Sequence, residues 1–212
     1  MKTYTKIIAA VAAGLACTAM TSKATLTTVP NTGADIVVGS AVTTGLGTQL
    51  ANNLGLGYSI GGAADTGTLQ SLVYASDSQA GHLSGYAFEY VVSVAVGDIA
   101  HLDLNGFNLS SVAVGIVSGA TPVSVDLGAN GVLDLTWSPT LGLSGPASVT
   151  FIVDTTATQF GNSLSGVSDS APPGSVGIFA PVPEPTTVAA GALMLLPFGL
   201  GALRSLRKDR IA

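Results

Sequence analysis

The sequence predicts an all-β fold, a single antiparallel β-sandwich that lies between a signal peptide and a C-terminal transmembrane helix. Three observations predict it. Apolar and polar side chains alternate in the middle of the chain, turn-forming residues interrupt these runs about every ten residues, and each end has an uncharged apolar run beside basic residues. We therefore divide the chain into residues 1–24, 25–181 and 182–212.

Residues 1–24 have the pattern of a secretory signal peptide. Lys2 and a second lysine precede a short apolar run, and Ser22 and Ala24 are small residues at the two positions that a signal peptidase recognises. We expect export through the Sec translocon and prefer cleavage between Ala24 and Thr25, with Cys17-Thr18-Ala19 as a second possible site. The expected partners of this segment are therefore the translocon and signal peptidase.

The only cysteine, Cys17, lies inside this segment. A lipoprotein signal would have a leucine three places before it, where this chain has Gly14. We therefore interpret Cys17 as a small residue of the signal peptide. Cleavage after Ala24 leaves a chain with no thiol, no disulfide and no cysteine ligand for a metal.

Four stretches of the middle region alternate most clearly, and we expect strands at 86–96, 123–127, 133–137 and 149–153. Weaker patterns predict further strands at 36–38, 69–74, 101–104, 112–117 and 175–179. Asn130-Gly131 predicts a hairpin turn between two of these runs, and Asn105-Gly106 predicts a second. Residues 49–54 are expected to form a short turn, and 25–68 has the weakest pattern.

The C-terminal end combines a proline-flanked acid, an apolar run and a basic tail. Pro183-Glu184-Pro185 is a stiff, extended tripeptide. The following residues, 186–203, are uncharged and would form about 27 Å of helix, close to the ~30 Å thickness of a bilayer core. Four basic residues then predict a cytoplasmic tail by the positive-inside rule: Arg204, Arg207, Lys208 and Arg210. Residues 25–183 are thereby placed beyond the inner membrane.

This C-terminal arrangement resembles a PEP-CTERM sorting signal, whose recognised segment corresponds to Val182, Pro183, Glu184 and Pro185. The resemblance covers residues 182–212 and departs from the family pattern in the interrupted basic tail. It implies recognition by an exosortase, a membrane enzyme of Gram-negative, exopolysaccharide-producing bacteria. The implied route is an inner-membrane-anchored precursor, removal of the tail, and transfer to the cell surface or extracellular matrix.

The exported middle region is also similar to ectodomains of other PEP-CTERM proteins over residues 67–183. The shared parts are two strand segments, the stretch 154–160 and the closing stretch 178–185. These ectodomains have no established activity. The similarity implies one continuous β domain that runs up to the sorting signal.

The middle region carries acids and no bases. Residues 25–181 contain ten Asp and Glu residues and no Lys or Arg, so their side-chain charge is −10 with neutral histidines. This charge repels phosphate and excludes nucleic acid as a partner. Crowded carboxylates without cationic partners are expected to have raised pKa values. A surface of Ser, Thr, Asn and Gly favours contact with neutral glycans such as exopolysaccharide.

A serine-hydrolase motif occurs once in the middle region. Gly57, Ser59 and Gly61 fit the pattern G-x-S-x-G, in which the serine is a nucleophile at a turn between a strand and a helix. Here the downstream sequence predicts another strand and not a helix. A surface serine hydrolase with Ser59 as its nucleophile is therefore the least favoured of the three functions that the sequence suggests.

Two groups of residues carry side chains of the kinds that bind metal ions. His82 and His101 are the only histidines, and His101 alternates with Asp103 and Asn105, so that a metal there needs another ligand from elsewhere. Around the expected hairpin, Asp126, Asn130 and Asp134 offer oxygen ligands for Ca²⁺ without the spacing of an EF-hand loop. Both groups are also typical of solvated strands and turns, and we expect no cofactor.

The sequence thus favours a non-enzymatic cell-surface or extracellular-matrix protein that an exosortase sorts and that associates with exopolysaccharide or biofilm. The alternative is a glycan- or ice-binding module. Regular Thr-x-Thr rows would favour ice binding, but only scattered pairs occur, at Thr25 with Thr27 and at Thr156 with Thr158.

Overall fold

The computed structural model describes residues 25–30, 36, 38–41, 45–61, 64–75, 81–107, 111–137, 142–169 and 173–182. Within these ranges the chain is all-β, as the alternation predicts, and forms fifteen strands. The predicted signal peptide and the apolar run at 186–203 lie outside the described residues. In the described ranges, no helix has the length and apolar character needed to cross a membrane.

The larger sheet has eight strands. Its main path runs in the order β1 (Thr27–Val29), β9 (Val112–Ser118), β13 (Ala147–Thr155), β6 (Tyr86–Val96), β5 (Asp65–Ala75) and β3 (Thr48–Asn52). Two short strands complete it: β2 (Gly39–Ser40) pairs with β9, and β4 (Leu56–Ile60) pairs with β5. The pairing of β2 with β9 is parallel and the others are antiparallel.

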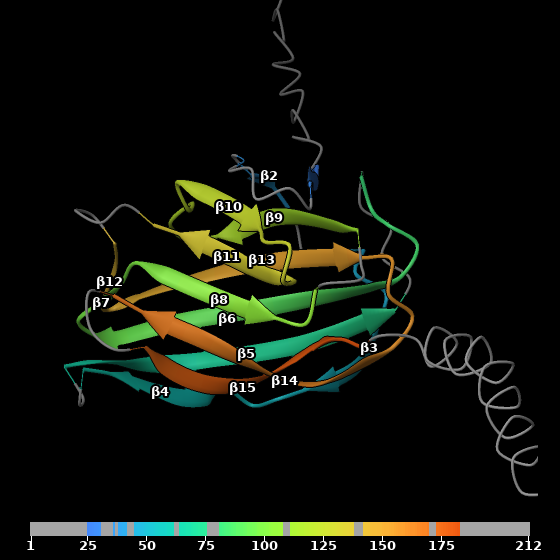
Figure 1. Cartoon of the computed structure of the whole chain (residues 1–212). Coiled ribbons are helices and arrows are strands. Elements are labelled where there is room, and N and C mark those ends of the chain that lie inside the picture. Colours follow the sequence, from blue (N-terminus) through green and yellow to red (C-terminus); the bar gives the residue numbers. More distant parts are fainter. Residues whose placement is uncertain are drawn as a thin grey trace, which may run out of the picture.

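The smaller sheet has five antiparallel strands, β10 (Ser124–Leu127), β11 (Val132–Thr136), β8 (His101–Asn105), β14 (Phe160–Ser168) and β15 (Gly174–Pro181). Figure 1 shows it lying against the larger sheet. A two-stranded sheet of β7 (Asp98–Ile99) and β12 (Leu143–Ser144) lies near one end.

One apolar core joins the two larger sheets. Phe88, Tyr90 and Val92 of β6 point into it from one side, and Leu102 and Leu104 of β8 reach it from the other, all fully buried. Burial of each such side chain stabilises the fold by about 1.5–3 kcal/mol relative to exposure. The period of two in the sequence therefore arises because each strand places every second side chain in this core.

A second, smaller apolar cluster covers part of the outer face of the larger sheet. Leu26 and Ala41 from the N-terminal segment pack there against Ala113 and Ile152. Gly115 allows this close approach, because a Cβ at that position would lie 2.7 Å from the Cβ of Ala41. The weakly patterned N-terminal region thus wraps over the sheet.

Side chains of the larger sheet hold the last strand, β15, in place. Asn53 Nδ2 donates a hydrogen bond of 3.0 Å to the carbonyl of Gly177, and the Phe179 N–H donates to Ser71 Oγ at 2.9 Å. Tyr90 Oη donates to the Phe179 carbonyl at 2.7 Å. These bonds satisfy edge-strand groups that no neighbouring strand pairs, and they fix the strand that leads to the predicted sorting signal.

Most of the predicted strands are confirmed, but one long strand was missed. β14, Phe160–Ser168, has the sequence FGNSLSGVS, which is rich in turn-forming residues. Its pattern is also reversed, since Leu164 is 60% exposed whereas Ser165 is fully buried. Pairing with β8 and β15 places this segment in the sheet despite its weak strand propensity.

The turn predictions were right in one case and wrong in two. Asn130-Gly131 lies in the hairpin between β10 and β11, as predicted, and Gly131 has a φ of 76°. Asn105-Gly106 makes no hairpin, because β8 belongs to the smaller sheet and the next strand, β9, to the larger one. Residues 49–54 were expected to form a turn, but most of them belong to β3, which pairs with β5. Ile36 forms an isolated bridge to Val125, and residue 37 of the predicted strand 36–38 lies outside the described residues.

Candidate functional site

Only two of the predicted sorting residues lie within the described part of the chain. The Thr25 N–H donates a hydrogen bond of 2.8 Å to the Ser40 carbonyl, so the expected mature N-terminus belongs to the larger sheet. The Val182 N–H donates to the Gln159 carbonyl at 3.2 Å, directly after β15. The remaining predicted residues lie outside the described ranges: Ala24, Pro183, Glu184, Pro185, Arg204, Arg207, Lys208 and Arg210.

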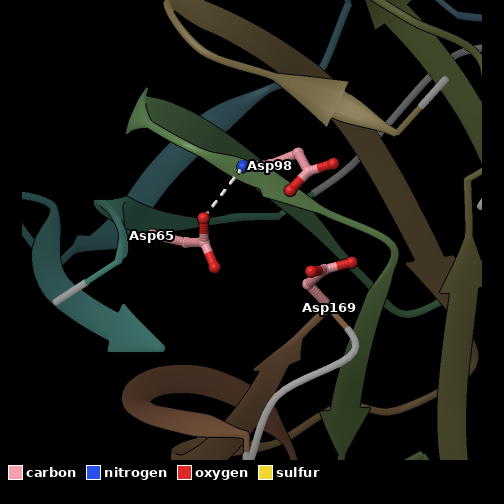
Figure 2. A group of neighbouring side chains, drawn as sticks. All are labelled: Asp65, Asp98 and Asp169. Carbon is pink, nitrogen blue, oxygen red and sulfur yellow. Dashed lines mark hydrogen bonds between the residues drawn. The ribbon is translucent and has the colours of Figure 1, made fainter. Parts of the chain in front are cut away.

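Three carboxylates from distant parts of the sequence meet at one end of the molecule (Figure 2). Asp65 begins β5, Asp98 begins β7, and Asp169 follows β14. One carboxylate oxygen from each lies within 4.8 Å of the others. We call these three residues the end cluster. Oxygen ligands at this spacing are of the kind that Ca²⁺ binds.

The backbone around Gly97 holds the end cluster together. Gly97 has a φ of 77°, and a Cβ on it would overlap Asp65 Oδ1. The turn thereby brings the Asp98 N–H within 3.3 Å of Asp65 Oδ1, to which it donates (Figure 2). Burial raises the pKa of the Asp98 carboxyl above its ordinary value, and the charges of Asp169 and Asp65 raise it further.

A second group of carboxylates lies on the outer face of the smaller sheet. Register places Asp126 of β10 beside Asp134 of β11, and Asp134 beside Asp103 of β8. We call these three residues the sheet-face row. The row ends at Gly166 of β14, where a Cβ would lie 3.2 Å from Asp103 Oδ2. Antiparallel register thus aligns like charges directly opposite one another, which is destabilising.

His101 lies beside the sheet-face row and offsets part of its charge when protonated. Its Nδ1 is 3.5 Å from Asp134 Oδ1 and 3.2 Å from Thr136 Oγ1. Burial raises the pKa of the Asp134 carboxyl; the charges of Asp103 and, to a smaller extent, Asp126 raise it too, while His101 lowers it. Burial also raises the pKa of Asp103, against a lowering by His101. Neighbouring acids thus contribute to the raised pKa values of Asp98 and Asp134, as expected for crowded carboxylates, whereas at Asp103 burial alone raises the pKa.

The structure joins parts of the two metal-ligand groups considered from sequence, and separates others. Asp126 and Asp134 of the hairpin group meet Asp103 of the histidine group in the sheet-face row. Asn130 instead accepts a hydrogen bond of 3.3 Å from the Val132 N–H within its own turn. Asn105 Nδ2 donates to the Leu164 carbonyl at 2.9 Å. His82 is exposed, and its Nδ1 lies 3.0 Å from the Leu83 carbonyl.

The end cluster was missed by sequence reasoning. Asp65, Asp98 and Asp169 lie in three separate segments with no common spacing, and no local pattern links them. The predicted strands give the alternation of side chains but not which strand ends lie together. Only the pairing of the long strands and the path of β14 bring these residues to one end.

The geometry required of a serine nucleophile is not found at Ser59. Ser59 lies inside β4, with its side chain exposed, and pairs with Thr66 of β5. A nucleophile elbow needs a sharp turn from a strand into a helix. Gly57 and Gly61 therefore flank an ordinary strand segment, and the motif match has no structural counterpart.

A row of hydroxyl groups crosses the open part of the outer face of the larger sheet. Thr68 of β5 pairs with Ser93 of β6, which pairs with Ser148 of β13. Ser93 Oγ donates to Ser148 Oγ at 3.2 Å, while Thr68 and Ser148 are exposed. This row is uncharged and offers both donors and acceptors of hydrogen bonds.

The Thr-x-Thr pairs do not form a continuous row. Thr27 belongs to β1 and pairs with Val114, whereas Thr156 and Thr158 lie in the connection between β13 and β14. The hydroxyl row is thus the more regular polar surface of this fold.

Comparisons with known proteins found no relative of this chain. No family model matches the chain, and neither the curated proteins nor the solved structures contain a match.

Proposed function

We propose that the chain is the precursor of a non-enzymatic cell-surface or extracellular-matrix protein, sorted through a PEP-CTERM signal and associated with exopolysaccharide or biofilm. Its exported part is a β-sandwich formed by the two larger sheets. The observation that carries the proposal is the charge layout: every Lys and Arg lies before Thr25 or after Leu203, beside an apolar run, and the folded part between them has none. Membrane insertion signals have this layout.

The position of the last strand supports the same proposal. β15 ends at Pro181, and the Val182 N–H is still bonded to Gln159. The tripeptide Pro183-Glu184-Pro185 follows at once in the sequence, so the proposed exosortase segment, residues 182–185, begins directly after the last strand. A protease needs an extended substrate, and the two prolines keep the segment out of a helix or sheet ladder.

Replacement of Glu184 tests the sorting proposal. In cells with an exosortase, Glu184→Ala is expected to keep the uncleaved precursor in the inner membrane, because the charge between the two prolines is removed. Asp209→Ala, which removes a carboxylate from the basic tail, is the matched control and is expected to be processed. Fractionation and intact mass measure both. Normal release of the Glu184→Ala protein would refute recognition of the tripeptide.

The mature N-terminus gives an independent test of export. Thr25 is expected at the start of the exported protein, since Ser22 and Ala24 fit the peptidase. Intact mass is the suitable measurement, because the middle region has no tryptic sites. A start before Thr25, or a lipid on Cys17, contradicts the assignment.

The hydroxyl row favours a second candidate function, the binding of a neutral glycan. Thr68, Ser93 and Ser148 form an uncharged polar line on an acidic protein, and sugar hydroxyls are matched by such donors and acceptors. The double variant Thr68→Ala/Ser148→Ala is expected to weaken retention on purified exopolysaccharide. Ser175→Ala, an exposed serine on the other sheet, is the control. Equal retention of the unmodified protein, the double variant and Ser175→Ala would reject this site. A thermal-hysteresis assay tests ice binding separately.

A further inference from the structure

The last described residue, Val182, lies at the end opposite the end cluster. The Val182 N–H bonds to Gln159, just before β14 begins at Phe160, and β14 is followed at its other end by Asp169. β14 has nine residues and is therefore roughly 30 Å long. We call the end that contains Gln159, Phe160 and Val182 the exit end.

Several connections lie together at the exit end. A Cβ at Gly106 would be 3.0 Å from the Ala180 Cβ and 3.2 Å from the Pro181 carbonyl. The Phe107 N–H donates to the Gly131 carbonyl at 2.9 Å, which adds the β10–β11 hairpin to this end. The described residues 105–107, 128–131 and 156–161 contain no Asp, Glu, Lys or Arg.

Among the described residues, the carboxylates nearest to the exit end are withdrawn from its surface. Asp154 is fully buried and accepts hydrogen bonds from the N–H groups of Leu83 and Thr155. Glu89 is 8% exposed and accepts a hydrogen bond of 2.8 Å from the Tyr74 hydroxyl. Among the described residues, three half-buried aromatic rings lie here instead, with Phe160 5.6 Å from Tyr86 and 5.7 Å from Phe179.

We infer that the exit end is a membrane-facing surface that lies against lipid headgroups in the anchored precursor, with the end cluster pointing away from the bilayer. The inference rests on the proposed membrane anchor. Residues 183–187 separate Val182 from the uninterrupted apolar run, and five extended residues reach at most about 17 Å. The exit end is therefore held at the bilayer surface, whichever way the fold is turned about the connection.

Charge and ring placement select this orientation. Anionic lipids repel carboxylates within a screening length of about 8 Å. The end cluster is roughly 30 Å away along β14, outside that range. Aromatic rings with one polar edge are enriched where headgroups meet the acyl chains, and Tyr86 is such a residue. In the part of the chain that the structure describes, the exit end thus brings fewer exposed carboxylates toward the lipid than the end cluster would.

Single-cysteine labels on the full chain test the orientation. The precursor with Cys17→Ser is placed in phosphatidylcholine vesicles with a minor fraction of phosphatidylglycerol and of lipid that carries a nitroxide on its headgroup. A fluorophore is attached to Gln159→Cys at the exit end or to Ser144→Cys at the opposite end. Both residues are exposed, and Ser144 pairs with Asp98.

We expect the nitroxide to quench the Gln159→Cys label several-fold more strongly than the Ser144→Cys label. Equal quenching, or stronger quenching at Ser144→Cys, in chains that float with the vesicles overturns the orientation and leaves the anchor intact. Failure of the labelled chain to float with the vesicles overturns the proposed anchor, and the orientation with it. The two failures are therefore distinguished by flotation.

Discussion

The end cluster and the sheet-face row each bring three carboxylates together, but the chain builds them differently. Asp65, Asp98 and Asp169 come from strand ends that are far apart in sequence, and their oxygens converge within 4.8 Å. The sheet-face row consists of neighbours in a ladder, spaced by the register of β10, β11 and β8. A glycine turn with a positive φ holds the first group, whereas regular pairing holds the second.

The difference shows which forces keep like charges close. In the end cluster, the turn at Gly97 places the Asp98 N–H on Asp65 and partly offsets the repulsion. In the sheet-face row, the opposite faces of the same strands bury Leu102, Leu104, Leu133 and Leu135 in the core. Burial of these leucines contributes several kcal/mol, which outweighs the repulsion between the half-buried carboxylates. The acids therefore follow the register that the leucines select.

The largest expected effect comes from adding a methyl group beside each cluster. Gly97→Ala is expected to lower the free energy of unfolding by about 2 kcal/mol or more, because an L residue is strained at a φ of 77° and its Cβ meets Asp65. Gly166→Ala, next to Asp103, is expected to cost less than about 1 kcal/mol, since Gly166 has no positive φ and the Asp103 carboxylate, 3.2 Å from the new Cβ, can shift to relieve the tight contact. Urea denaturation measures both. Equal losses of unfolding free energy in the two variants would show that the backbone constrains both clusters to the same extent.

Neutralising the middle of the sheet-face row is expected to stabilise the fold. Asp134→Asn removes a carboxylate that faces Asp103 on one side and Asp126 on the other. We expect a gain of about 1 kcal/mol at neutral pH, since the replaced group is half-buried and repelled from both sides. Asp98→Asn, at the more open end cluster, is the comparison and should raise the free energy of unfolding by a smaller amount. A loss of stability in Asp134→Asn would mean that the contact with His101 outweighs the repulsion.

Mild acid is expected to stabilise the protein by a smaller amount. The pKa values of Asp98, Asp103 and Asp134 are raised in the folded state, so these groups bind protons more tightly when folded. The destabilisation is complete above the raised pKa values, declines as the pH falls through them, and is gone below the unfolded value of about 3.9. Melting temperature should therefore rise between neutral pH and about pH 4.5, and less so in Asp134→Asn. A steady fall over this range contradicts the repulsion.

The smallest expected effect is a difference between Ca²⁺ and Na⁺, which distinguishes the end cluster from the sheet-face row. NaCl should raise the melting temperature slightly by screening, and CaCl₂ at equal ionic strength should raise it somewhat more, which corresponds to a gain in unfolding free energy of about 1 kcal/mol at most. The surplus is expected to come from the end cluster, where three oxygens converge. Asp169→Asn should remove it, and Asp126→Asn should keep it. An identical response to both salts would leave diffuse screening alone.

Much of the fold was predictable, because most of its strands carry their own signal. Phe88, Tyr90 and Val92 alternate with less apolar residues, and the burial of these side chains in β6 follows that pattern. β14 was not predictable, since an exposed Leu164 and a buried Ser165 invert the rule. Part of the sheet-face row could be predicted from the sequence, because the Asn130-Gly131 turn predicts that Asp126 and Asp134 are neighbours. The addition of Asp103 required the register between β11 and β8.

The sequence by itself determined the all-β class and the separation of charge between the ends and the middle. Alternation is a local property, since each strand reports which of its faces is buried. The tertiary structure alone decided that β8 and β9 belong to different sheets, that Asp65 meets Asp98 and Asp169, and that Val182 lies at the opposite end. These features depend on which strands pair across long separations, and pairing is chosen by the packing of the whole core and not by any single segment.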